Sequence, residues 1–365
     1  MDFPKETSPA SESSSILQGS FYASDSLPKY RQRFKASKNM SNLVLIHDAS
    51  LRKESDLDPV EVYELVQNAP PHLSIYFAEI LSIKRDDNIH TLILPRYGPS
   101  IYEVLEDNTF RGFSKVQCRK ISFEILSAVQ YLHDQGIIHT DLNSEVIRFR
   151  TDKFNLITDA HSTYFYVEDT RIVICDLTKC RKAQTYNDKI QIDIYRAPEV
   201  IMGLKWNKFV DCWSVGCVVC EVFCGSPFFA SQRNTSDPDL FQLTHIMTYC
   251  GIVPYSMTER ADPKFNLYPK KTIFTNNQVF CVGNPEYENQ SFNDIYKVIR
   301  GLMCYEWSIR MSCKQALKLP FYTKYSIHNN GSTKQDDAAE LSQLPIRPKR
   351  KKPRCLNEFL SVFYR

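Results

Sequence analysis

Glycine is scarce in this sequence, and the first quarter of the chain holds almost none of it. Of the 11 glycines, Gly19 is the single one that precedes Gly98. A G-x-G-x-x-G loop, in which backbone N–H groups approach phosphate groups because no Cβ atom obstructs them, is therefore excluded from this region. The sequence also lacks any run of 18 consecutive apolar residues, so it predicts no membrane-spanning helix and no membrane partner.

A strong net charge is absent as well. The formal net charge is +3 over 365 residues, which is too small to indicate binding to nucleic acid along the whole chain, and we expect no specific nucleic-acid partner. With 43% hydrophobic and 24% charged residues, the composition is that of a globular protein with one large core or two adjoining cores. The Ser-rich first residues lack the apolar region of a secretory signal, so we expect an intracellular, soluble protein.

The 12 cysteines are predicted to be reduced thiols, because a chain without a secretory signal stays in a reducing compartment. Four of them, Cys212, Cys217, Cys220 and Cys224, lie close together in the sequence. The last three have the i, i+3, i+7 spacing of one helix face inside an apolar run, and buried cysteine behaves as a small hydrophobic residue. We therefore interpret this group as part of a core and not as a zinc site, whose ligands usually come in pairs on loops.

The pattern of apolar residues divides the chain into four parts. Residues 1–25 are predicted to be a disordered Ser-rich leader, 26–97 a small unit rich in strands, 98–325 a larger helical unit, and 326–365 a flexible tail. In the small unit we expect strands at 42–47 and 90–94 and a helix at 56–67, which Asp58 and Pro59 open in the cap and first-turn positions. In the helical unit we expect helices at 100–106, 115–135, 211–224, 239–250, 292–303 and 313–316, and strands at 146–149 and 172–175 separated by a polar insertion.

The tail carries a compact basic cluster at 347–354, with the sequence RPKRKKPR. Such a cluster is of the type that nuclear import receptors bind, and it is equally compatible with a solvated surface tail. The apolar segment 356–364 that follows is suited to docking on the body of the protein or on a partner. We expect a nuclear location, with a cytoplasmic pool as an alternative.

Five short motifs that carry chemistry occur in order. They are His139-Thr140-Asp141-Leu142, Cys175-Asp176-Leu177-Thr178, Tyr195-Arg196-Ala197-Pro198-Glu199, Asp211-Cys212-Trp213-Ser214-Val215-Gly216, and Arg310 before Pro320-Phe321-Tyr322. Together they resemble protein kinases, over residues from about 94 to 322. The His-Thr-Asp form of the kinase catalytic loop and the insertion before Asp176 resemble the LAMMER (CDC2-like, CLK) kinases in particular. The resemblance implies an α+β, bilobal protein-kinase fold with a small, degenerate β-rich lobe and a larger α-helical lobe.

The resemblance also implies a role for each motif residue. Asp141 matches the catalytic-loop aspartate that accepts the substrate's hydroxyl proton, and Asp176 matches the aspartate that holds magnesium on the ATP phosphates. Three other matches are structural: Asp211 binds the catalytic-loop backbone, and Glu199 forms a buried ion pair with Arg310. His139 is a structural residue of the same loop in this family.

At the positions that contact nucleotide, the sequence departs from the family. Matching Glu61 to the helix glutamate that pairs with the ATP-binding lysine places Ile46 at the lysine position, with His47 as the neighbouring choice. Val146 replaces the asparagine that holds a second magnesium ion, and a valine cannot coordinate a metal. Further departures are Asn143 and Ser144 in place of Lys-Pro, Thr178 in place of glycine, Ile192 in place of threonine, and a LAMMER signature matched only at Leu243.

Two functional interpretations therefore remain open. In the first, the chain is a catalytically impaired kinase domain, a pseudokinase, which needs no cofactor and acts as a nuclear binding or scaffolding module for protein partners such as splicing proteins. In the second, it is an active Ser/Thr or dual-specificity kinase that uses ATP and Mg²⁺ to phosphorylate proteins rich in Arg and Ser. The second interpretation needs a lysine from another strand, for which Lys35 and Lys38 are the candidates.

Overall fold

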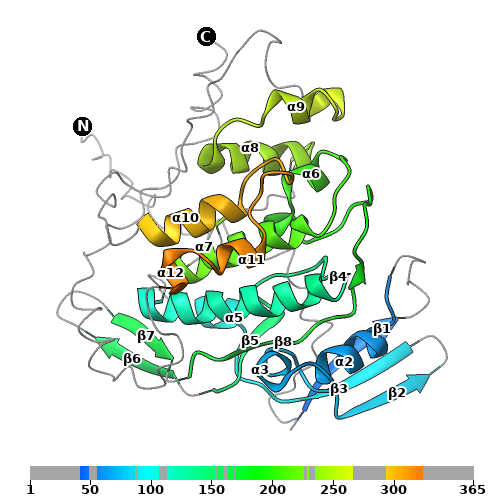
Figure 1. Ribbon diagram of the computed structural model, residues 1–365, viewed down its shortest axis with the longest axis vertical. Coiled ribbons are helices and arrows are strands. Elements are labelled where there is room, and N and C mark those ends of the chain that lie inside the picture. Colours follow the sequence, from blue (N-terminus) through cyan, green and yellow to red (C-terminus); the bar gives the residue numbers. More distant parts are fainter. Residues whose placement is uncertain are drawn as a thin grey trace, which may run out of the picture.

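The structure is a computed structural model that describes residues 42–48, 56–86, 89–106, 113–152, 154–158, 163–167, 169–225, 228–229, 235–265 and 293–323. The predicted Ser-rich leader, Lys35 and Lys38, the basic cluster and the C-terminal apolar segment lie outside these residues. The described elements form a small strand-containing region beside a helical body, and Figure 1 shows the small region in blue and cyan at the lower right. This arrangement agrees with the α+β, two-part fold that the motifs predict.

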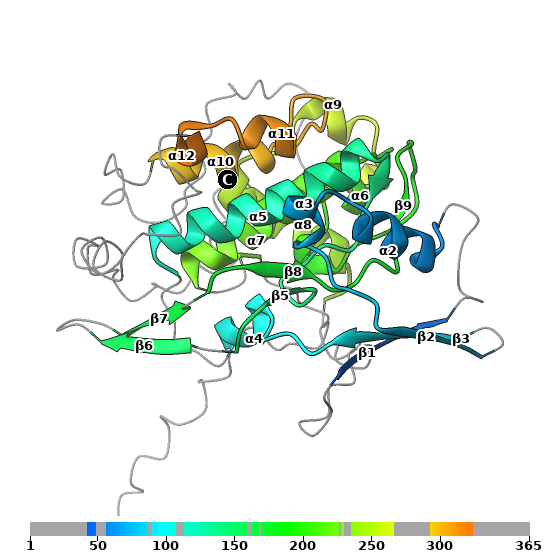
Figure 2. The same cartoon turned by 60° about the horizontal axis from the view of Figure 1, so that its bottom comes forward.

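The small region contains one antiparallel sheet and two helices. Strands β1 (Asn42–Asp48), β3 (Ile89–Pro95) and β2 (Ser82–Asp86) lie in the order β1-β3-β2, and Ile46 is opposite Thr91. Helices α2 (Pro59–Gln67) and α3 (Pro71–Ser74) follow β1 in the chain, and Figure 2 shows them between the sheet and the helical body. The predicted helix at 56–67 begins at Pro59, because the Asp58 side chain accepts a hydrogen bond from the Val60 N–H and caps the helix.

The helical body is built around α5 (Lys115–Asp134) and α7 (Phe209–Cys224). Helices α10 (Asn293–Leu302), α11 (Cys313–Ala316) and α12 (Pro320–Thr323) pack on these two. Helix α4 (Ile101–Glu106) leads into the body, and α6 (Pro198–Ile201), α8 (Pro238–Cys250) and α9 (Tyr255–Thr258) lie on its far side from the sheet (Figure 1). Helix α5 ends before Gly136, which has a φ of 72°, a value that a residue with a Cβ atom adopts only with strain.

Two pairs of short strands lie between helices α5 and α7 in the chain. β4 (Ile137–Ile138) pairs with β9 (Arg181–Lys182), and β5 (Ile147–Phe149) pairs with β8 (Ile172–Ile174), whose six residues are all buried. The predicted polar insertion between β5 and β8 contains a further hairpin, β6 (Phe154–Thr158) with β7 (Thr163–Val167), which the sequence pattern did not predict. Figure 2 shows this hairpin extending to one side of the body.

Helix α7 lies in the centre of the core. Trp213, Cys217 and Cys220 are at most 1% exposed, as predicted for the apolar face of this helix. None of the helices within the described ranges is both long and apolar enough to cross a membrane.

Candidate active site

Asp211, in the first turn of α7, holds the backbone of the loop that contains Asp141. One carboxylate oxygen accepts the His139 N–H at 2.8 Å and lies 2.9 Å from His133 Nε2, while the other accepts the Thr140 N–H at 2.9 Å. The Asp211 side chain is fully buried, so these charge-assisted hydrogen bonds are strong. This geometry is the contact with the loop backbone that the resemblance implied for Asp211.

Thr140 adopts a backbone conformation that is rare for its residue type. Its φ is 66°, and a β-branched residue in this left-handed region costs about 1–3 kcal/mol. Besides the Asp211 contact, the Thr140 hydroxyl donates a hydrogen bond of 2.6 Å to the Lys179 carbonyl. These bonds fix the loop, and Asp141 is the next residue.

Asp141 and Asp176 lie near enough to interact electrostatically. Burial, and then the charge of Asp176, raise the pKa of Asp141 well above its usual value, while Lys179 and Arg196 act in the opposite direction. Asp176 follows β8 and is 3% exposed, and one of its oxygens accepts the Thr178 N–H at 2.9 Å and the Thr178 hydroxyl at 2.6 Å. The threonine found where the family has glycine therefore binds the predicted magnesium ligand directly.

His139 supports this loop from inside the core. It is 1% exposed, and the Asp141 N–H donates to its Nδ1 at 3.3 Å. Burial lowers the pKa of His139, which favours the neutral ring that can accept this bond. The side chain is a structural part of the loop, in agreement with its expected role.

The residue predicted at the position of the second metal ligand is apolar and buried. Val146 is fully buried, and its N–H group donates to the Asn143 side-chain oxygen. Asn143 is the one amide side chain of the segment 139–146, and it is fully engaged: its Nδ2 donates to the Asp141 carbonyl at 2.8 Å, and its Oδ1 also accepts the Glu145 N–H at 2.9 Å. Asn143 closes the loop and is not free to bind a cation in place of the missing asparagine.

A buried hydrogen-bond chain that sequence reasoning missed lies below the loop. The Tyr195 hydroxyl lies 2.7 Å from the Ser144 hydroxyl and 2.7 Å from Glu221 Oε1. Burial raises the pKa of Glu221 to about 8, so the carboxyl is protonated at neutral pH. The available signal was that Glu221 is the single charged residue in the otherwise apolar segment 212–224.

The predicted ion pair between Glu199 and Arg310 is present. Both side chains are at most 2% exposed, and the guanidinium contacts both carboxylate oxygens at 2.7 and 2.8 Å. Arg310 also donates to the carbonyls of Cys304, Phe209 and Tyr305. This bidentate pair ties α6 to the segment after α10 and satisfies the buried charges on both sides.

Two further residues of the prediction, Glu61 and Ile46, lie in the small region. Glu61 is exposed on α2, and Ile46 lies on β1 opposite Thr91. Tyr63 of α2 is fully buried and donates a 2.5 Å hydrogen bond to the Cys175 carbonyl, next to Asp176. A tyrosine thus makes the contact between this helix and the segment that contains Asp176.

Arg181 makes a second contact, between the residues just before α2 and the segment after Asp176. Its guanidinium donates to Asp56 at 2.7 Å and to both oxygens of Asp188 at 2.8 and 3.0 Å. It also lies over the rings of Tyr186 and Trp206. Because the Leu57 N–H donates to the Cys180 carbonyl as well, the start of α2 is attached directly to this segment.

The family assignment follows from comparison with known proteins. The model of the protein kinase domain matches residues 75–322, more than half of the chain. The chain belongs to the protein kinase domain family. A crystal structure of another kinase domain superposes with a TM-score of 0.59 over 77% of this chain and 87% of that one, at 22% identity, and supports the fold.

Among its relatives this kinase domain is similar, at a distance, to the LAMMER and CLK kinases. It is 28% identical to the serine/threonine-protein kinase AFC1 of Arabidopsis thaliana over 64% of this chain and 55% of that protein. It is 23% identical to the dual specificity protein kinase CLK1 of Mus musculus over 75% of this chain and 59% of that protein. The kinase domain therefore spans little more than half the length of these relatives.

Proposed function

We propose that this kinase domain is catalytically impaired and acts as a binding or scaffolding module for nuclear proteins. The observation that carries the proposal is the predicted position of the second metal ligand, where Val146 is fully buried and Asn143 is committed to the loop. The carboxylate of Asp176 would hold one magnesium ion, which would neutralise charge on the phosphates, whereas in the described segment 139–146 neither Val146 nor Asn143 is suited to hold a second. With Ile46 or His47 at the predicted lysine position, the domain also lacks the permanent positive charge that a lysine supplies to the ATP phosphates.

The expected loss of rate is large. Removing one charge-stabilising group from a reaction site costs roughly 3 kcal/mol, and two such groups slow the reaction by about four orders of magnitude. The structural residues Asp211, Glu199 and Arg310 stay in place because they stabilise the fold whether or not a reaction occurs. A module of this kind keeps its helical body for binding partners.

The second candidate is an active kinase, and one observation favours it. Asp141 and Asp176, the two carboxylates that phosphate transfer needs most, interact across the loop. An active enzyme would transfer the ATP γ-phosphate to Ser or Thr, and its resemblance to the LAMMER kinases points to proteins rich in Arg and Ser as substrates.

The two candidates differ in how they bind nucleotide, because a working kinase must hold the complex of metal and ATP. We would titrate the purified chain with ATP, with and without Mg²⁺, and follow its thermal unfolding, since a ligand of the folded state raises the apparent stability. An impaired domain shows no magnesium-dependent shift. The variant Asp176→Ala, with the exposed Asp152→Ala as the matched control, shows whether any shift depends on the predicted metal ligand.

A magnesium-dependent shift that Asp176→Ala removes and Asp152→Ala retains would overturn the proposal and support the active enzyme. Transfer of phosphate to Arg/Ser-rich peptides would then be measured directly. A shift that does not depend on magnesium identifies a nucleotide-binding domain without phosphate transfer, which agrees with the proposal.

A further inference from the structure

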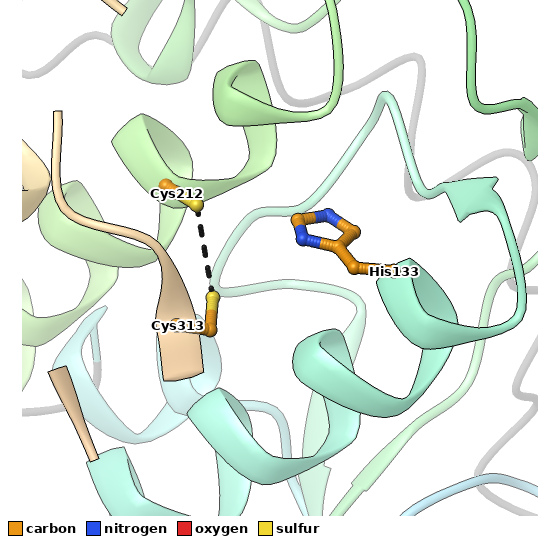
Figure 3. A group of neighbouring side chains, drawn as sticks. All are labelled: His133, Cys212 and Cys313. Carbon is orange, nitrogen blue, oxygen red and sulfur yellow. Dashed lines mark hydrogen bonds between the residues drawn. The ribbon is translucent and has the colours of Figure 1, made fainter. Parts of the chain in front are cut away.

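Three side chains that bind metals well meet in the helical body, away from Asp141 and Asp176. They are His133 at the end of α5, Cys212 in the first turn of α7, and Cys313 at the start of α11, and all three are buried. Figure 3 shows the two sulfur atoms facing each other, with the edge of the imidazole ring turned toward them. The three ligand atoms lie within 4.8 Å of one another.

The spacing of the sulfur atoms fits a tetrahedral metal ion. Cys212 Sγ and Cys313 Sγ are 3.8 Å apart. Two thiolates bound to zinc at about 2.3 Å, with a tetrahedral angle between them, have a sulfur-to-sulfur distance of about 3.8 Å. A disulfide bond requires about 2.05 Å, so the two thiols as placed suit a shared ion better than a bond to each other.

His133 has the neighbour that a metal-binding histidine usually has. Its Nε2 lies 2.9 Å from a carboxylate oxygen of Asp211, which leaves Nδ1 as the nitrogen that can bind an ion. A carboxylate on the far side of the ring fixes the tautomer and increases the basicity of the ligand nitrogen. The sequence therefore supplies both a ligand and the group that orients it.

Zinc binds cysteine as the thiolate, so binding at this site displaces the protons of both thiols. Two thiolates and a neutral imidazole carry a charge that cancels that of Zn²⁺, so the ion and these three ligands together bury no net charge.

We propose that His133, Cys212 and Cys313 bind one zinc ion and supply three of its four ligands. The ion joins α5, α7 and α11, which come from segments far apart in the chain. It also fixes His133 with its Nε2–H toward Asp211, the residue that holds the His139 and Thr140 N–H groups. The zinc site thus stabilises the scaffold of the loop, and it is independent of whether the domain transfers phosphate.

The test measures the metal content of the full chain. We would express it with ZnCl₂ in the medium, purify it under reducing conditions and determine metals by mass spectrometry. We expect about one zinc per chain, which resists chelators in the folded protein, because the ligands are buried, and is released when guanidinium unfolds it. The variants Cys212→Ala and Cys313→Ala should lose the zinc.

The matched control is Cys220→Ala. Cys220 is as buried as Cys212 and lies in the same helix, and its sulfur contacts Met303, so a general effect of losing a core thiol appears in all three variants. If either variant fails to fold, Co²⁺ incorporated into the unaltered chain replaces that comparison, because a thiolate-bound cobalt ion shows a charge-transfer absorption band. The proposal would be overturned if the unaltered chain contains no zinc, or if Cys212→Ala and Cys220→Ala contain equal zinc. A native mass that is lower by two hydrogens and is restored by reduction would indicate a Cys212–Cys313 disulfide and would overturn it as well.

Discussion

Glu221 shows how a single residue takes its character from its surroundings. In water a glutamate is ionised at neutral pH, but here burial raises the pKa of the side chain to about 8. The Tyr195 hydroxyl lies 2.7 Å from Glu221 Oε1 and 2.7 Å from the Ser144 hydroxyl. The protonated carboxyl therefore belongs to a network that connects α7 with the loop containing Asp141.

This network predicts a pH dependence of stability. The pKa of Glu221 is higher in the folded than in the unfolded protein, so the folded state binds the proton more tightly. The stabilisation is complete below about pH 4.5 and is lost as the pH rises to about 8, with a slope of at most about 1.4 kcal/mol per pH unit. Urea unfolding measured from pH 5 to 8 should show this slope in the unaltered chain and a smaller one in Glu221→Gln. Parallel pH profiles for the two proteins would contradict it.

Among the elements, α2 is held to the helical body in an unusual way. Protein kinases join this helix to the site through a lysine and a glutamate, whereas here Glu61 is exposed and the contacts come from Tyr63 in the helix and Asp56 just before it. Arg181 is 5% exposed and binds Asp56 and Asp188 together. The helix is therefore fixed against the segment after Asp176 by contacts within the protein.

We predict that Arg181→Met loosens both elements. The two aspartates lose their shared cation, and the packing on Tyr186 and Trp206 is reduced. Backbone hydrogen exchange should become at least several-fold faster in residues 59–67 and 181–188, and its rate elsewhere should stay unchanged. Lys182→Met is the control, because Lys182 is the exposed neighbour in the same strand. Equal exchange rates in the two variants would rule out a special role for Arg181.

The sequence predicted elements well where one helix or strand carries its own pattern. The apolar spacing of α5 and its glycine stop placed its ends within one residue. The ordered motifs predicted the contact of Asp211 with the loop backbone and the ion pair of Glu199 with Arg310. The β6–β7 hairpin was missed because its short strands lie in a segment that is polar on average. Contacts between distant segments were missed for a different reason: nothing near Cys212 in the sequence indicates that Cys313, and not Cys217, is its neighbour.

For the molecule as a whole, the contacts that stabilise the fold are distinct from the residues predicted to bind nucleotide. Hydrogen bonds and ion pairs occur where Asp211, Arg310 and Arg181 connect helices and loops. At two positions predicted to contact nucleotide, the chain has Val146, which is buried, and Ile46. Under the function proposed above, the fold presents surfaces to nuclear partners, which makes the location of the chain in the cell the next question.

The basic cluster at 347–354, outside the described residues, leads to a prediction about that location. Its six basic side chains are of the type that nuclear import receptors bind. Replacing all six with Gln in a fluorescently tagged chain should shift the protein from the nucleus to the cytoplasm, as should deleting the cluster. The control replaces Pro348 and Pro353 with Ala, which leaves the charge intact and should keep the nuclear signal. An unchanged distribution after the loss of all six charges would show that the cluster is a solvated tail, and that nuclear entry, where it occurs, depends on another part of the chain.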